Sequence, residues 1–277
     1  SLRLKGKLYA LPESRETVAL YYNKRLLKTP PKSVPEMLET AATLEGVQYG
    51  MVFNTDFYYG LGYFFGSGMT FFDRDMKLTI NSPGTLETLK WYEKLPAAKG
   101  VLANHEYLKA DSLYKEGQTA MIINGPWALV DYQKKLGDDL GLATLPTLAN
   151  GQPAASWVGV KCLMFNTNSD TRHRQFAKDF AMFMTSPESQ LFLSEQAGHI
   201  PAVMGVEIPE TSPLAVFQAQ ADVGTPASID PEVSLVWEPM NKAIRQVLQK
   251  ESAPESALAE AETVIKAKLE AMRAQAK

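Results

Sequence analysis

The sequence predicts an α/β fold that closes with a helical section. Short apolar runs bounded by turn residues indicate buried strands, and early in the chain they alternate with helical segments. The stretch 117–127 shows this best, because Asn124-Gly125-Pro126 breaks the apolar run 120–123 and Pro126 suits the first turn of a helix. Trp127 therefore follows the carboxyl end of a predicted strand, where open α/β sheets bind ligands. A buried core position explains the same tryptophan equally well.

Composition restricts the class of protein. The 277 residues suffice for one large domain or two ordinary ones, and 45% hydrophobic with 21% charged residues is typical of a soluble globular protein. A net charge of −3 without a stripe of Lys and Arg argues against nucleic acid as a partner. No apolar run approaches the ~18 residues that a membrane helix needs.

Cysteine use and the start of the sequence bear on the cellular compartment. The single Cys162 cannot form an internal disulfide, and we expect it to be a buried small hydrophobe. This fits a cytosolic protein and also an exported bacterial protein. The sequence opens at Ser1 without Met and without a signal peptide, so we expect a processed or trimmed chain that is compatible with export.

Hydrophobic spacing and turn residues predict the remaining elements. Strands are expected at 6–10, 18–22, 49–54, 77–80 (an edge strand), 120–123, 140–145 and 158–165, with a polar link at 13–17. Helices are expected at 35–44, 107–115, 172–184, 187–198, 214–222 and 233–250, and from residues 83 and 254 onward. Ser33, Ser82 and Ser186 stand where they can cap helices. The aromatic stretch 57–66 fits a helix packed on a core, or a surface that stacks flat ligands.

Catalytic and metal-binding signatures are scarce. The three histidines are isolated from one another and from Cys162, which argues against a zinc site, and we expect neither metal nor cofactor. No nucleophile elbow or P-loop motif occurs, and Cys162 has no evident histidine partner. A pair of glycosidase carboxylates stays open, because sequence does not give the distance between them.

A set of aromatic and acidic residues at the ends of elements points to sugar binding. Its members are Glu16, Asp56, Tyr58, Trp127 and Trp237. Sugars present apolar C–H faces and a rim of hydroxyls, so their sites need flat rings and groups that make strong hydrogen bonds. This chemistry is that of a binding protein.

The chain resembles the extracellular solute-binding proteins of sugar ABC transporters, closest to the maltose/maltodextrin-binding branch. The resemblance rests on the residues 6–12 (Gly-Lys-Leu-Tyr-Ala-Leu-Pro), Glu16, 21–24, 116–127 and Leu145-Pro146. It implies a periplasmic-binding-protein-like fold of type II, whose two lobes close on the ligand by a hinge. It also implies a periplasmic or extracellular location, lipid-anchored or soluble, and a membrane permease as partner.

Each candidate residue matches a family position. Glu16 matches a carboxylate that bonds sugar hydroxyls near the hinge. Asp56 stands where the family usually has Glu, and its shorter side chain reaches less far. Tyr58 matches an aromatic residue that packs on the sugar and bonds it.

The tryptophans and Asn241 complete the match. Trp127 and Trp237 match two indoles that stack on successive sugar rings. Asn241 stands where maltose binders often carry Arg, so other glucosides stay open as ligands.

The chain departs from the family at its start, where members have roughly a hundred further residues, consistent with two full lobes. We expect 8–160 and 214–277 to form the whole C-terminal lobe and 161–213 to be a residual segment of the N-terminal lobe. Phe176, Phe180 and Phe183 form an apolar face on that segment, which needs a cover such as a second copy of the chain.

Three functions follow from this reading. The first is a sugar-binding subunit of an ABC importer, which we expect to bind weakly because one wall of the site is missing. The second is an enzyme that acts on glycans. The third is an interaction domain that has lost ligand binding.

Overall fold

The computed structural model of the chain describes residues 2–4 and 7–275, so Gly6 of the first expected strand lies outside the described residues. The helices are α1 (Val34–Thr43), α2 (Phe57–Gly66), α3 (Pro83–Lys94), α4 (Tyr107–Lys115), α5 (Leu129–Leu136), α6 (Thr171–Met184), α7 (Pro187–Ala197), α8 (Leu214–Asp222), α9 (Trp237–Leu248) and α10 (Pro254–Gln275). Short 3₁₀ helices are η1 (Leu95–Ala97), η2 (Pro126–Ala128), η3 (Gly137–Asp139) and η4 (Pro231–Leu235).

Within the described residues the strands form three sheets. They are β1 (Arg3–Leu4), β2 (Lys7–Leu8), β3 (Leu11–Glu16), β4 (Ala19–Asn23), β5 (Tyr49–Asn54), β6 (Val101–Asn104), β7 (Thr119–Asn124), β8 (Leu140–Ala143), β9 (Trp157–Leu163), β10 (Ile200–Pro201) and β11 (Thr225–Pro226). The main sheet has the order β6-β5-β7-β4-β8, in which β6, β5 and β7 are parallel and β4 runs antiparallel to β7 and β8. The second sheet has the order β10-β3-β9-β11, and β1 pairs with β2.

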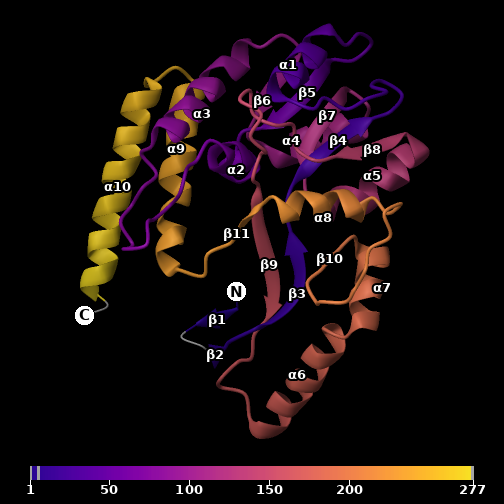
Figure 1. The fold of residues 1–277 in the computed structure, drawn as a ribbon, viewed down its shortest axis with the longest axis vertical. Coiled ribbons are helices and arrows are strands. Elements are labelled where there is room, and N and C mark those ends of the chain that lie inside the picture. The colour runs from indigo at the N-terminus through magenta and orange to yellow at the C-terminus, as the bar shows by residue number, and fades with distance from the viewer. Residues whose placement is uncertain (1, 5–6, 276–277) are drawn as a thin grey trace.

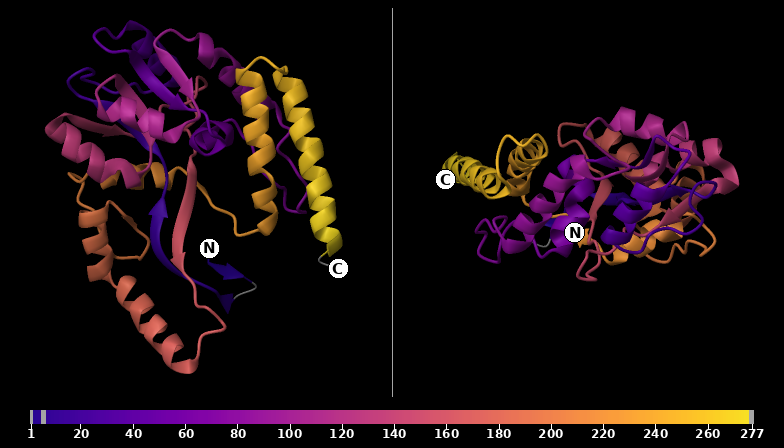
Figure 2. Two further views of the ribbon diagram at one scale, coloured as in Figure 1. Left: turned by 180° about the vertical axis from the view of Figure 1, so that it is seen from behind. Right: turned by 90° about the horizontal axis from the view of Figure 1, so that it is seen from above.

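Helices cover both faces of the main sheet. Alternation along the strands sends Leu20 and Phe53 into a large core with α1, α2, α3, α9 and α10. The neighbouring residues Tyr21 and Val52 face the opposite core, which α4, α5 and α8 cover. Figure 2 shows α9 and α10, orange and yellow, side by side at one edge of the molecule. The predicted α/β class is therefore confirmed as a three-layer arrangement.

Several elements were predicted with the bounds that the structure gives them. They are β5 at 49–54, α4 at 107–115 and α8 at 214–222, and the helical alternative for 57–66 is observed as α2. Ser33, Ser82 and Ser186 each accept a hydrogen bond from a backbone N–H in the first turn of α1, α3 and α7. Gly198 ends α7 in the left-handed conformation at φ 71°, which a glycine adopts without strain.

The expected polar link at 13–17 is wrong, because most of it belongs to β3. Strand β3 pairs with β9 in an antiparallel ribbon that runs from the main body towards α6 (Figure 1). The ribbon lies mostly outside the two cores, so β3 needs few apolar side chains, and Leu11 is its only large apolar residue. Its backbone pairing with β9 holds it extended, and a hydrophobic pattern does not reveal such a strand.

Three further expectations need correction. Residues 77–80 contribute only an isolated bridge between Phe72 and Leu78, and no strand. Strand β6, which the sequence reading missed, has two buried ends but a half-buried centre, so it shows no clean alternation. Cys162 is exposed, because it lies near the end of β9 beyond the packed cores.

Helix α6 projects from the rest of the molecule (Figures 1 and 2). Only Ala181 is buried in this helix. Among the described helices, none combines the length and hydropathy that a bilayer crossing requires.

Candidate functional site

The first turn of α2 organises the candidate site. Asn54, the last residue of β5, accepts a hydrogen bond from the Asp56 N–H at 3.0 Å, and Asp56 Oδ1 accepts one from the Tyr58 N–H at 3.0 Å. Asp56 is thus the N-cap of α2, where a carboxylate also complements the positive end of the helix. The predicted ligand residue therefore commits one of its two oxygens to the helix.

The ring of Trp127 lies beside that of Tyr58, with centroids 6.2 Å apart and planes inclined by 43°. Trp127 belongs to η2, which follows β7 after the turn at Gly125. A Cβ at Gly125 would come within 2.0 Å of the indole, so only glycine permits this approach. Trp127 is 37% exposed, which favours the predicted ligand platform over the core anchor.

Glu16 brings a carboxylate to the same place. It ends β3, and its Oε1 lies 2.5 Å from Nζ of Lys161 on β9. Burial raises the pKa of Tyr58 well above its usual value, and the nearby negative charge of Glu16 raises it further. The Tyr58 hydroxyl is therefore neutral and can both donate and accept a hydrogen bond.

A second aromatic group meets the first turn of α2 at Phe57. Trp237 stands at the start of α9. The centroid of its ring lies 5.6 Å from that of Phe57 and 5.9 Å from that of Trp157, the first residue of β9. Asn241, one turn further along α9, accepts a hydrogen bond from the Phe57 N–H at 2.8 Å. Asn241 thus supports α2, and its amide N–H groups are the part left for a ligand.

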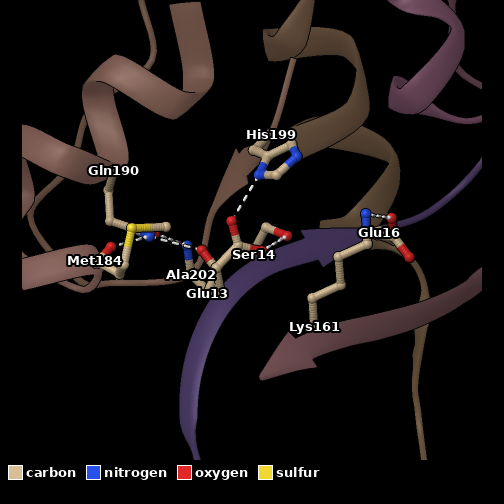
Figure 3. Close-up of polar contacts among 8 residues, drawn as sticks. All are labelled: Glu13, Ser14, Glu16, Lys161, Met184, Gln190, His199 and Ala202. Atoms are coloured by element: carbon tan, nitrogen blue, oxygen red, sulfur yellow. Dashed lines mark hydrogen bonds and ion pairs between the residues drawn. The ribbon is translucent and has the colours of Figure 1, made fainter. Parts of the chain in front are cut away.

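A largely buried polar network anchors β3 (Figure 3). The Glu13 carboxylate contacts His199 Nδ1 at 2.7 Å and accepts a hydrogen bond from the Ser14 hydroxyl at 2.7 Å. The Gln190 amide donates to the Glu13 carbonyl at 2.6 Å and accepts from the Ala202 N–H at 3.0 Å. These contacts fix β3 to α7 and β10, and hence fix the strand that carries Glu16.

A cavity of about 430 Å³ opens beside Trp157. Its walls include Phe65 and Phe72, with Asp73 and Asp230 among its polar residues. The ring of Trp157 stacks on that of Phe65 at a centroid distance of 6.0 Å and an angle of 21°. No group of three His, Cys, Asp or Glu side chains with metal-binding geometry occurs in residues 2–4 and 7–275.

The structure brings all six predicted residues to the neighbourhood of one helix turn. They are Glu16, Asp56, Tyr58, Trp127, Trp237 and Asn241. Sequence reasoning missed Trp157 and Lys161. Trp157 directly precedes the strand predicted at 158–165, as the other candidates stand at element ends, and that position was the available signal. Lys161 could be identified only from the register of β3 against β9, which the sequence does not show.

Known proteins match the chain over most of its length. The family model described as "Bacterial extracellular solute-binding protein" matches residues 1–222. A galactooligosaccharide-binding protein of Bacillus subtilis is 27% identical over 96% of the chain, and a maltodextrin-binding protein of the same organism is 28% identical over 94%. The chain spans 67% of the length of each of these two relatives.

Solved structures of sugar-binding proteins share this fold. A crystal structure of a cyclo/maltodextrin-binding protein complexed with maltotetraose superposes with a TM-score of 0.83 and 32% identity. The match covers 97% of this chain and 72% of that protein. The fold is therefore that of a periplasmic-binding protein of which one lobe is only partly present. Because the family model covers most of the chain, the chain belongs to the bacterial extracellular solute-binding protein family.

Proposed function

We propose that the chain binds a maltooligosaccharide or a related glucoside as the substrate-binding component of an ABC importer. The observation that carries this proposal is the first turn of α2, where three aromatic rings meet two carboxylates. Flat rings suit the C–H faces of a sugar, and carboxylates accept hydrogen bonds from its hydroxyls. The maltodextrin-binding relative and the structure with maltotetraose support the choice of ligand.

Each residue takes a role that its surroundings allow. Trp127 and Trp237 stack on successive sugar rings, and Tyr58 packs on the sugar and bonds it through its neutral hydroxyl. Glu16 accepts hydrogen bonds from hydroxyls, and Asp56 does so with the oxygen that does not cap α2. Asn241 donates from its amide nitrogen, because its oxygen already holds α2.

We further propose that 8–160 and 214–277 form one lobe and that 161–213 belongs to a second one. The two cores around the main sheet draw on the first set of residues with the addition of the buried Ile200 and the partly buried Ile208, whereas α6 lies outside both cores. The β3/β9 ribbon is then the connection at which the lobes move. In this arrangement the protein works outside the cytoplasm, anchored by lipid or free, and delivers its ligand to a membrane permease.

Tryptophan fluorescence tests the proposal directly. Maltotriose, maltotetraose and a galactooligosaccharide are titrated into the wild type and into Trp127→Ala. We expect a saturable change with a glucose oligomer, of low affinity because this chain supplies one side of the site, and a weaker response in the variant. A wild type that responds to none of these sugars would contradict sugar binding and favour an interaction domain.

The alternative of a glycan-acting enzyme has its own test. The same sugars are incubated with the protein, and the release of reducing ends is measured. We expect no release above a blank, because the carboxylates Glu16 and Asp56 are engaged with Lys161 and with the α2 backbone. Release that is lost in Glu16→Gln would establish the enzyme instead.

A further inference from the structure

Lys161 lies on the face of the β3/β9 ribbon that carries Glu16. In the antiparallel register Ser14 faces Lys161 and Glu16 faces Gly159. Residues that face each other across a ladder point to the same side, and so do residues two apart on one strand. Ser14, Glu16 and Lys161 therefore share one face, as Figure 3 shows for Glu16 and Lys161.

Gly159, which faces Glu16, has no side chain and leaves space for Lys161 to reach the Glu16 carboxylate. A Cβ at Gly159 would meet nothing closer than the Glu16 carbonyl oxygen at 3.9 Å, so the space beside the Glu16 side chain is open. The lysine chain crosses this space diagonally, a distance that long side chains span, and places Nζ 2.5 Å from Glu16 Oε1.

Fold stability does not account well for this pair. The Lys161 side chain is 47% exposed and that of Glu16 is 25% exposed. Ion pairs in such positions contribute little to folding, because water screens the attraction and the long side chain loses freedom. Neither residue belongs to the two hydrophobic cores.

The ammonium keeps donors for a ligand. A lysine ammonium carries three N–H groups. Among the residues that the structure describes, the Lys161 ammonium contacts only the Glu16 carboxylate. An ammonium that donates hydrogen bonds thus lies beside the Glu16 carboxylate, which accepts them and whose charge acts on Tyr58.

We propose that Lys161 is a specificity-determining residue, which binds one vicinal diol of the oligosaccharide together with Glu16. The carboxylate accepts the O–H of one hydroxyl, and the ammonium donates to the oxygen of its neighbour. This inference rests on the proposed function, because it assumes that the ligand lies on the Tyr58–Trp127 surface. It predicts a preference for sugars whose adjacent hydroxyls are both free.

The test compares Lys161→Met, Lys161→Arg and the wild type in titrations with maltotriose and with its monodeoxy analogues. Met matches the length of the chain without its charge, and Arg keeps the charge. We expect Lys161→Met to weaken maltotriose binding about tenfold, the loss of one charge-assisted hydrogen bond, with an unchanged thermal midpoint. Lys161→Arg should restore most of the affinity.

The analogues separate direct contact from an effect through Glu16. For the wild type, one monodeoxy analogue should bind more weakly than maltotriose. For Lys161→Met, the same analogue and maltotriose should bind with equal affinity. Equal maltotriose affinity in Lys161→Met and the wild type, with a loss in Trp127→Ala, would overturn the role of Lys161 and leave the proposed function standing. A Lys161→Met variant that loses affinity for every analogue in the same ratio would also overturn it. A wild type that binds no glucoside would overturn the proposed function, and this inference with it.

Discussion

The side-chain oxygen of Asn241 accepts a hydrogen bond from the backbone N–H of Phe57 at 2.8 Å, which joins α9 to the first turn of α2. The N–H groups of a first turn have no partner within their own helix, so a side chain from elsewhere in the fold satisfies this one. Phe57 itself is fully buried. The bond therefore fixes the turn from which Tyr58 meets Trp127.

Replacing Asn241 with Leu should destabilise the fold, because the Phe57 N–H loses its acceptor in a buried place. We expect a loss of about 1–2 kcal/mol in the free energy of unfolding, the usual cost of a lost cap or buried hydrogen bond. Asn241→Asp keeps the acceptor and adds a charge that suits a helix N-terminus, so it should unfold like the wild type. Urea denaturation measures both variants. Equal stability of Asn241→Leu and the wild type would show that the bond does not hold α2.

Gly125→Ala should displace the Trp127 indole. The backbone at Gly125 is extended, with φ −95° and ψ 177°, so alanine fits the backbone and the conflict lies in its Cβ, 2.0 Å from the ring. We expect a shift in tryptophan emission and about tenfold weaker sugar binding, as for a lost stacking contact. In the Trp127→Ala background the same change should have no further effect on binding. An additive effect there would mean that Gly125 acts by another route.

The contact between Glu232 and Arg273 should make the free energy of unfolding depend on pH. Arg273 donates to both carboxylate oxygens, at 2.9 and 2.7 Å, and ties the end of α10 to η4. The hydrogen bonds from Arg273 hold the Glu232 pKa below its usual value, so this stabilisation is complete above the unfolded pKa of about 4.3. It is lost as the pH falls through the lower folded pKa.

Glu232→Gln removes the titrating group while leaving its shape. We expect the variant to be less stable than the wild type at pH 7 and equally stable once the pH lies below the lowered folded pKa of Glu232, where the wild-type carboxyl is protonated as well. Thermal unfolding across this range measures the difference. A gap between the two proteins that does not close in acid would contradict the assignment to this carboxyl.

The candidate site could be predicted from sequence where a residue stands at the end of a buried element. Trp127 follows a fully buried strand with an apolar centre and a proline turn, so its place depends on local signals that the sequence carries. Tyr58 likewise follows β5 at the start of a helix with strong aromatic content. The prediction of a polar link at 13–17 was wrong for the opposite reason, because β3 is held by pairing with a strand almost 150 residues later in the chain.

Contacts that depend on register lie beyond sequence reading. Lys161 reaches Glu16 only because Gly159 stands opposite Glu16, and a shift of one residue would send the lysine to the other face. Asn241 was found through the family position of a ligand residue, and its bond to Phe57 depends on how α9 crosses α2. His199 and Glu13 are 186 residues apart and offer no local signal of their contact.

The aromatic face of α6 gives the last prediction. Phe176, Phe180 and Phe183 share one side of the helix and are 55%, 55% and 65% exposed. Replacing all three with Ser should change the free energy of unfolding by less than about 0.5 kcal/mol, since surface substitutions remove little packing. Phe217→Ala, at a fully buried ring, should cost about 3–5 kcal/mol and serves as the control.

The triple variant should also bind less of a hydrophobic dye and, where copies associate through this face, sediment as a monomer. A large loss of stability in the triple variant would mean that α6 packs on other parts of this chain, and the assignment of 161–213 to a second lobe would then fail.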